Sequence, residues 1–268
     1  MGYKMIVLDL DGTLTNSKKE VSQRNQEVLQ RAMEKGIIVV LASGRPTRGV
    51  MPIAKMLELK KHHGCILSFN GGRIIDLTTE ECLFQIDIPE GWLDKIYHLS
   101  RKCGIGLSTY EGVDKLVTED DNAYIQLELG INQMKKITPE SIIEYVTFPV
   151  PKYLLAGDPQ SIAQAEPLFK QMLGEHLNVF RSDPHFLEIL PPKIDKAYSL
   201  KKLIEKLHIS REEVIACGDG YNDISMIKFA GLGVAMENAN DQAKAVADYI
   251  TRSNDQDGIA HVVEQFLF

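Results

Sequence analysis

Short apolar runs of strand length alternate with helix-length segments at both ends of this 268-residue chain. Near the N-terminus these runs are rich in Ile, Val and Leu and occupy residues 4–8, 37–42 and 65–69. Continuous apolar runs of this length are typical of strands buried on both faces of a parallel sheet. Between the first two runs, residues 22–35 show helical periodicity, with Ser22 placed to cap the helix and Gly36 to end it.

The C-terminal part repeats this order, whereas the middle of the chain does not. After residue 210 we expect strands at 213–217 and 232–235, and helices at 222–229, 243–247 and 259–266. The middle holds short strand candidates at 82–86, 105–109, 115–118, 145–148, 152–156, 178–181 and 186–189, with helices at 91–102 and 161–173. Such a change of pattern indicates that an α+β segment interrupts a parallel α/β domain.

We therefore predict an α/β fold in which a doubly wound, mostly parallel, Rossmann-like sheet forms the core and an α+β cap domain is inserted. Prolines lie near both boundaries between the core and the inserted segment, at Pro89 and at Pro191-Pro192. The catalytic core is expected at residues 1–84 and 191–268, and the inserted cap at residues 85–190, where it would set substrate specificity.

Composition and charge exclude several classes of protein. The 30 basic and 37 acidic residues give a net charge of −7, and no basic stripe of the kind that nucleic-acid binders carry is present. The longest apolar runs are too short to cross a bilayer, and the N-terminus leaves no room for a signal peptide. The four cysteines are far apart, which favours reduced thiols. We expect a cytoplasmic protein, and the sequence leaves its oligomeric state open.

The first chemically distinctive segment, Asp9-Leu10-Asp11-Gly12-Thr13, directly follows a predicted strand. Open α/β sheets bind ligands at the carboxyl ends of their strands, and residues two apart in an extended chain point the same way. Both carboxylates are therefore expected to face one site. A calcium loop of the EF-hand type is a weaker alternative, because a strand precedes the motif where an EF-hand has a helix. A surface turn rich in Asp and Gly is another.

Two further segments lie at a strand end and a helix start. Ser43 and Gly44 follow the second predicted strand, where a small hydroxyl and free backbone N–H groups suit a phosphate oxygen. The same pair would equally serve as a helix cap and turn. Lys196 opens an amphipathic helix after the middle segment, and nearby Lys193 is an alternative to it. A lysine at a helix start is, taken alone, usually a surface residue.

The segment Gly218-Asp219-Gly220-Tyr221-Asn222-Asp223 again follows a buried strand. Its two acids would repel one another at such a turn, so a hard divalent cation between them would stabilise the arrangement. Alternatively, Asn222 or Asp223 merely caps the next helix.

These four segments, at this spacing and in this order, resemble the motifs of the haloacid dehalogenase superfamily of phosphohydrolases. Within it the chain is similar to the Cof-like sugar phosphatases, which carry an α+β cap between the second and third motifs. The resemblance covers essentially the whole chain and extends to residues 68–72, 233–239, 247–251 and 257–258. One departure is that Lys193 and Ala197 stand where family members often have glycines beside the lysine.

The resemblance implies a Mg²⁺-dependent phosphatase that acts on a small phosphorylated metabolite through an aspartyl-phosphate. Asp9 would be the nucleophile, and Asp11 the general acid and then the base. The implied metal ligands are Asp9, the Asp11 carbonyl and Asp219, with Gly220 or Asp223 helping through backbone, water or indirect contacts. The implied phosphate-binding groups are Ser43, the amides of Leu10 and Gly44, Lys196 and Asn222.

Substrate identity and some alternative functions stay open at this stage. Family members act on hexose phosphates, and some on flavin or pyridoxal phosphates. Candidate substrate contacts are Arg45, Asn70, His185 and Glu188, each of which has a structural interpretation as well. A phosphomutase of the same superfamily, or a sugar-phosphate-binding regulatory protein, would carry similar residues. A receiver-type signalling domain is disfavoured because it is about half as long and has no insertion.

Overall fold

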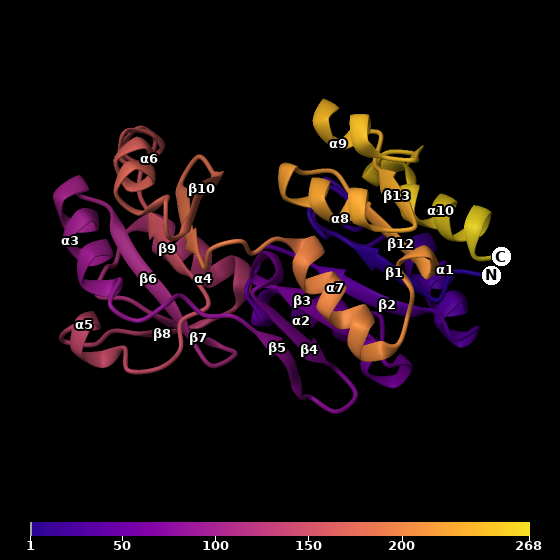
Figure 1. Cartoon of the computed structure of the whole chain (residues 1–268), viewed down its shortest axis with the longest axis horizontal. Helices are drawn as coiled ribbons and strands as arrows, with labels where there is room; N and C mark the ends of the chain where they lie inside the picture. Colours follow the sequence, from indigo (N-terminus) through magenta and orange to yellow (C-terminus); the bar gives the residue numbers. More distant parts are fainter. Residues whose placement is uncertain (1) are drawn as a thin grey trace. The chain divides into compact units, whose positions relative to one another are not determined.

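The computed structural model describes residues 2–268, and they divide into two compact units (Figure 1). The first unit contains the residues up to Gly44, Val50–Phe84 and Asp195–Phe268. The second contains Arg45–Gly49 and Gln85–Ile194.

The first unit is built on one eight-stranded sheet with strand order β14-β13-β12-β1-β2-β3-β4-β5. Its strands are β1 (Met5–Leu8), β2 (Ile38–Ala42), β3 (Cys65–Ser68), β4 (Arg73–Asp76), β5 (Cys82–Gln85), β12 (Val214–Gly218), β13 (Leu232–Ala235) and β14 (Tyr249–Ile250). All pairings from β14 to β3 are parallel, and β4 runs antiparallel to β3. The central strand β1 is flanked by β12 and β2, so the ends of these three strands lie together.

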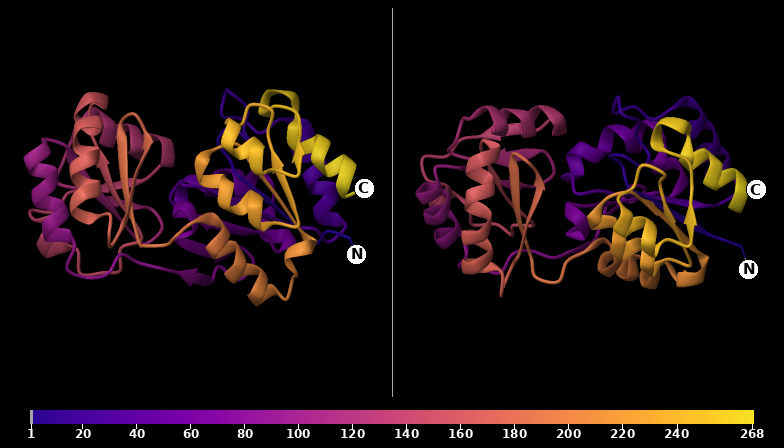
Figure 2. Two further views of the ribbon diagram at one scale, coloured as in Figure 1. Left: turned by 45° about the horizontal axis from the view of Figure 1, so that its top comes forward. Right: turned by 90° about the horizontal axis from the view of Figure 1, so that it is seen from above.

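Helices cover both faces of this sheet (Figure 2). One face packs against α1 (Gln23–Glu34), α2 (Thr47–Met56), α9 (Asp241–Val246) and α10 (Gly258–Phe266), and the other against α7 (Lys196–Leu207) and α8 (Ile224–Phe229). Short 3-10 helices are η1 (Leu59–His62), η2 (Phe69–Gly71), η3 (Arg211–Glu213), η4 (Tyr221–Asp223) and η5 (Asn254–Gln256). The buried residues of β1 alternate between the two cores, as a strand covered on both faces requires. The predicted doubly wound α/β core is confirmed.

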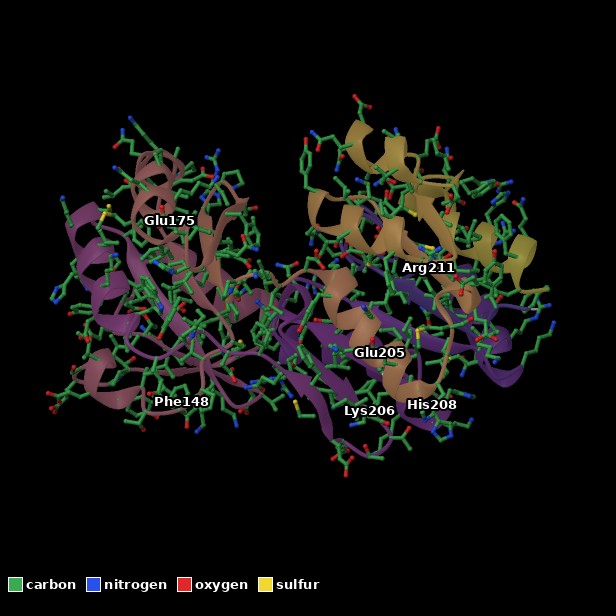
Figure 3. The ribbon with its side chains drawn as sticks, in the orientation of Figure 1. Phe148, Glu175, Glu205, Lys206, His208 and Arg211 are labelled. Carbon is green, nitrogen blue, oxygen red and sulfur yellow. The ribbon has the colours of Figure 1, made fainter. Side chains whose placement is uncertain are left out.

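Local sequence signals fix where these helices begin. The Ser22 hydroxyl oxygen accepts a hydrogen bond from the Asn25 amide at 3.1 Å and so caps α1, as expected. Gly36 follows that helix with φ +86°, a conformation that only glycine adopts at low cost. Asp195 caps α7 through the Tyr198 amide at 2.8 Å. Figure 3 labels Glu205 and Lys206 in the last turn of α7, at the opposite end of the helix from Lys196.

The second unit is an α+β arrangement around a six-stranded sheet with strand order β10-β11-β9-β6-β7-β8. Its strands are β6 (Gly106–Glu111), β7 (Lys115–Val117), β8 (Lys135–Ile137), β9 (Tyr153–Ala156), β10 (Asn178–Asp183) and β11 (Phe186–Leu190). Its helices are α3 (Leu93–Cys103), α4 (Ala123–Asn132), α5 (Ile142–Tyr145) and α6 (Pro159–Leu173). Among the described strands of this sheet, β7 and β8 pair in parallel and the other neighbours pair antiparallel.

The middle of the chain differs from the expectation in several places, and helix α4 was not predicted at all. Residues 145–148 were expected as a strand, but residue 145 ends the helix α5 and residues 146–148 form no strand. That helix begins where the Ser141 hydroxyl accepts a hydrogen bond from the Glu144 amide. Strand β8 was not expected, because its Lys-Lys-Ile sequence lacks an apolar run. Residues 191–194 lie with the second unit and not with the core, since α7 of the core starts only after its cap at Asp195. None of the helices in residues 2–268 has the length and apolar character needed to cross a membrane.

Candidate active site

The segment that follows β1 places Asp9 at the carboxyl end of the central strand. The Asp9 amide donates to the carbonyl of Cys217 at 3.0 Å, so this residue continues the pairing of β1 with β12. Gly12, with φ +90°, turns the chain, and the amides of Leu14 and Thr15 then donate back to the carbonyls of Asp9 and Leu10. Asp9 is 6% exposed, whereas Asp11 is partly exposed. The turn therefore leaves one acid buried and the other accessible to solvent.

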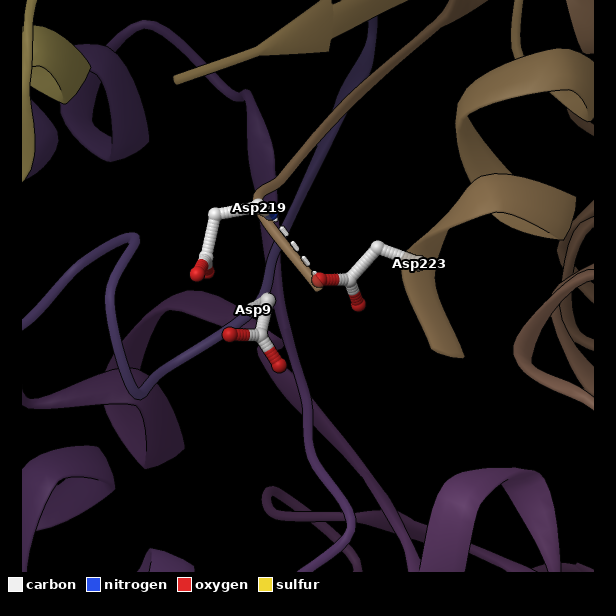
Figure 4. A group of neighbouring side chains, drawn as sticks. All are labelled: Asp9, Asp219 and Asp223. Carbon is white, nitrogen blue, oxygen red and sulfur yellow. Dashed lines mark hydrogen bonds between the residues drawn. The ribbon is translucent and has the colours of Figure 1, made fainter. Parts of the chain in front are cut away.

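The loop after β12 brings two more acids to the same place. Figure 4 shows Asp219 and Asp223 beside Asp9. Asp223 is fully buried, and its Oδ2 accepts hydrogen bonds from the amides of Asp219 at 3.0 Å and Gly220 at 2.8 Å. Asp223 therefore holds the loop in shape, while the Asp219 carboxylate accepts a hydrogen bond from the Thr13 hydroxyl at 2.7 Å.

Lys196 lies between two of these acids. Its ammonium group is fully buried and donates to Asp9 Oδ1 at 2.5 Å and to Asp223 Oδ1 at 2.6 Å. Burial alone would lower the pKa of Lys196, but the charges of Asp223 and Asp9 outweigh it and raise that pKa above its usual value. The exposed Lys193 has no such environment. The structure thus brings Lys196 to the acidic cluster.

The residues present fit a hard divalent cation. Asp9, Asp219 and Asp223 each offer a carboxylate oxygen, and these oxygens lie within 4.8 Å of one another. Three carboxylates against the one ammonium of Lys196 leave two negative charges unbalanced. Burial and the charge of Asp223 raise the pKa of Asp9 well above its ordinary value, although Lys196 opposes this. Burial likewise raises the pKa of Asp219 to about 6, against the lowering effect of Thr13. Oxygen donors with excess negative charge are what Mg²⁺ requires.

A second group of predicted residues meets at the ends of β2 and β3. The Ser43 amide donates to Leu67 at 2.8 Å, and the Ser43 carbonyl accepts from the Asn70 amide at 3.0 Å. Asn70 adopts φ +55°, and its side-chain oxygen accepts a hydrogen bond from Asn222 at 3.0 Å. A Cβ atom on Gly44 would lie 3.1 Å from the Asn70 amide group, so these residues are in close contact. The structure therefore brings Ser43, Gly44, Asn70 and Asn222 together.

The other predicted substrate contacts belong to the second unit. The Arg45 guanidinium donates to the Gly49 carbonyl at 3.4 Å. Glu188 is buried on β11 and pairs with Lys152 at 3.2 Å. The His185 ring stacks on Tyr124, with 4.6 Å between the ring centroids. Each therefore has a structural contact inside its own unit, and a role in substrate binding stays a prediction.

Several residues around the acidic cluster were not anticipated from the sequence. Asn238 donates to the Gly12 carbonyl at 2.8 Å, and Asn240 donates to the Asp219 carbonyl at 3.0 Å. Lys19 forms an ion pair with Asp11 at 2.9 Å. The two asparagines follow β13, the neighbour of β12 in the sheet, and Asn238 lies within the family-like segment 233–239, so the sequence held a signal for this position.

Gly12 permits a test of how closely the two acidic loops must approach. A Cβ atom at Gly12 would collide with the carboxylate of Asp219, whereas one at Gly36 would meet nothing within 4 Å. Both glycines have φ near +90°. We expect Gly12→Ala and Gly36→Ala each to lose about 1–2 kcal/mol of unfolding free energy from backbone strain. Only Gly12→Ala should also lose the activity of this site, by about 100-fold, because it would displace Asp219.

Urea unfolding and steady-state kinetics on both variants check this prediction. Equal activity in the two variants would show that the displacement of Asp219 does not matter.

The chain is similar to known proteins over nearly its whole length. A sequence model of the family described as haloacid dehalogenase-like hydrolase matches residues 6–263. The crystal structure of a haloacid dehalogenase-like hydrolase from Bacteroides thetaiotaomicron has a TM-score of 0.93 and 48% identity, covering 98% of this chain and 99% of that one. Phosphatase YwpJ of Bacillus subtilis is 30% identical, covering 98% of this chain and 100% of its own. The 5-amino-6-(5-phospho-D-ribitylamino)uracil phosphatase YcsE of that organism is 31% identical, with 98% and 96% covered.

Proposed function

This chain belongs to the haloacid dehalogenase-like hydrolase family, and from that membership we propose that it is a Mg²⁺-dependent phosphatase of a small phosphorylated metabolite. The observation that carries the proposal is the cluster of Asp9, Asp219 and Asp223 around the buried Lys196. Such a cluster at the end of a central parallel strand suits a phosphate ester and a divalent cation together.

Asp9, Asp219 and the carbonyl of Asp11 would hold the Mg²⁺, with Gly220 and Asp223 in support. Bound Mg²⁺ would neutralise the repulsion between a carboxylate nucleophile and a phosphate dianion. The Asp223 carboxylate would act mainly through the chain itself, because its two oxygens already accept from Lys196 and from two backbone amides.

In the first half-reaction, a carboxylate oxygen of Asp9 attacks phosphorus while the bond from phosphorus to the ester oxygen breaks. Protonated Asp11 gives its proton to the departing alkoxide, so that an alcohol leaves and an aspartyl-phosphate remains. The division of roles fits the burial of the two acids. Asp9 is enclosed beside Lys196, whereas Asp11 is partly exposed and can exchange protons with solvent.

In the second half-reaction, water attacks phosphorus and the bond from phosphorus to the Asp9 oxygen breaks. The Asp11 carboxylate takes a proton from that water, which returns both acids to their starting states and releases inorganic phosphate.

The Lys196 ammonium, the Ser43 hydroxyl, the amides of Leu10 and Gly44 and the Asn222 side chain would bind the oxygens of the transferring phosphoryl group. Charge spreads onto these oxygens in the transition state, where a cation held in a buried site is most effective. The contact between Asn70 and Asn222 supports an orienting role for Asn70. Recognition of the remainder of the substrate is assigned to the inserted unit, with Arg45, His185 and Glu188 as candidate contacts.

A sugar phosphate is the substrate class that we favour. The chain resembles the Cof-like sugar phosphatases, and the relative YcsE is named for a substrate with a phosphorylated ribityl chain. Both kinds of compound carry an alkyl phosphate beside several hydroxyl groups.

Phosphate release from a panel of monophosphates tests the proposal directly. The panel should include hexose phosphates, 5-amino-6-(5-phospho-D-ribitylamino)uracil, pyridoxal phosphate and flavin mononucleotide, each with Mg²⁺ and with excess EDTA. We expect release from one or a few compounds, lost with EDTA and restored by added Mg²⁺. Transfer of phosphate between positions of a sugar without release would indicate a mutase instead. Binding of a sugar phosphate without any turnover would indicate a regulatory protein.

A further inference from the structure

Lys19 contacts Asp11, the partly exposed acid in the turn after β1. Its ammonium group lies 2.9 Å from Asp11 Oδ1, although the two residues are eight positions apart along the chain. The Lys19 side chain is 64% exposed and that of Asp11 is 36% exposed. An exposed ion pair of this kind contributes little to folding stability, so any importance of Lys19 would lie elsewhere.

The loop that carries Lys19 is held in a defined shape. The side-chain oxygen of Asn16 accepts hydrogen bonds from the amides of Lys18 and Glu20, both at 3.0 Å. The backbone carbonyl of Asn16 accepts from the Lys19 amide at 2.9 Å, and the Asn16 amide donates to Glu20. Lys19 itself has φ +64°, an unusual conformation for a residue with a side chain. The loop therefore commits Lys19 to a conformation that costs energy, and it points the side chain toward Asp11.

Contacts with the C-terminal part of the core fix this loop from outside. The Ser17 amide donates to Asp255 at 2.8 Å, and Asn254 donates to the Thr15 carbonyl at 2.9 Å. Asn254 in turn contacts Asn238, which donates to the Gly12 carbonyl. The loop that carries Lys19 and the turn that carries Asp11 both contact the same C-terminal part of the core. These contacts fix the position of the Lys19 ammonium relative to the Asp11 carboxylate.

We propose that Lys19 is a positioning residue that holds the Asp11 carboxyl group in the orientation needed for proton transfer to the leaving group. The proposal rests on the proposed function, in which Asp11 protonates the departing alkoxide. Proton transfer requires a donor within hydrogen-bond reach of the leaving oxygen. Lys19 would fix the orientation of this partly exposed side chain through the ion pair.

Two substrates with different leaving groups separate this role from a general structural one. An alkyl phosphate needs a proton on its leaving oxygen, whereas p-nitrophenyl phosphate releases a stabilised phenolate that needs little or none. In Lys19→Met we expect kcat/KM for the best alkyl phosphate of the panel to fall about tenfold, part of what a positioned general acid supplies. For p-nitrophenyl phosphate kcat/KM should be nearly unchanged.

The neighbouring lysine gives a matched control. Lys18 is exposed on the same loop, so Lys18→Met should keep wild-type kcat/KM for both substrates. Lys19→Arg should restore most of the activity on the alkyl phosphate. In an Asp11→Asn background, Lys19→Met should cause no further loss, because the two residues act through one group.

The outcomes distinguish failure of this inference from failure of the proposed function. Equal losses on both substrates, no loss on either, a gain in activity, or a further loss in the Asp11→Asn background would each overturn the role of Lys19. Full activity of Asp11→Asn on the alkyl phosphate would instead overturn the proposed function, on which this inference depends.

Discussion

In Asp9→Asn protein we expect phosphate release to be abolished while the fold stays intact. The amide oxygen of asparagine is a poor nucleophile, and loss of a catalytic nucleophile lowers turnover by at least ~10⁴-fold in comparable enzymes. The fold should tolerate the change because the pKa of Asp9 is already raised well above its ordinary value, chiefly by burial. Lys196 would also keep the Asp223 carboxylate as its ion-pair partner, so the substitution leaves no buried ammonium without a counter-charge.

The measurement compares Asp9→Asn with the wild type and with Asp241→Asn. Asp241 is an exposed residue at the start of α9, so its substitution makes the same chemical change away from the site. Turnover, circular dichroism and the urea unfolding midpoint are measured for all three proteins. Ordinary activity in pure Asp9→Asn protein would eliminate Asp9 as the nucleophile. Loss of activity together with unfolding would contradict the tolerance expected here.

Much of the core and of its acidic cluster could be predicted because both depend on short-range sequence patterns. Apolar runs identify β1 and β12, and the acids directly after each run must lie at the same sheet edge once the strands pair in parallel. Asp9 and Asp219 therefore meet for reasons that the sequence already contains.

Other parts of the fold and of the site depend on tertiary contacts, which no local sequence pattern reveals. Strand β8 exists because it pairs with β7, although its own residues have little strand character. Lys19 meets Asp11 through a loop that the Asn16 side chain helps to organise. Asn70 meets Asn222 across 152 positions of sequence, through two turns that adjoin different strands. In each case a tertiary contact overrides or supplements the local preference.

Lys196→Ala is expected to lose both activity and stability, whereas Lys193→Ala is expected to lose neither. Removing the Lys196 ammonium leaves the Asp9 and Asp223 carboxylates buried without their cation. Breaking a buried ion pair in this way typically costs about 3–5 kcal/mol of unfolding free energy. The variant would also lack the positive charge proposed to stabilise the transferring phosphoryl group, so turnover should fall by about 100-fold or more. Lys193 is exposed, and its truncation removes neither contact.

Because Lys196→Ala also opens a cavity, Lys196→Met is needed to separate charge from packing. Methionine fills a similar volume, so Lys196→Met should recover part of the unfolding free energy that Lys196→Ala loses, while its turnover stays as low. Urea unfolding and the phosphate-release assay on the three variants provide both quantities. If Lys193→Ala proved the more damaging change, the lysine of the site would have been misassigned. If Lys196→Met recovered turnover along with stability, Lys196 would serve packing alone, and stabilisation of the phosphoryl group would have to come from other groups at the ends of β1, β2 and β12.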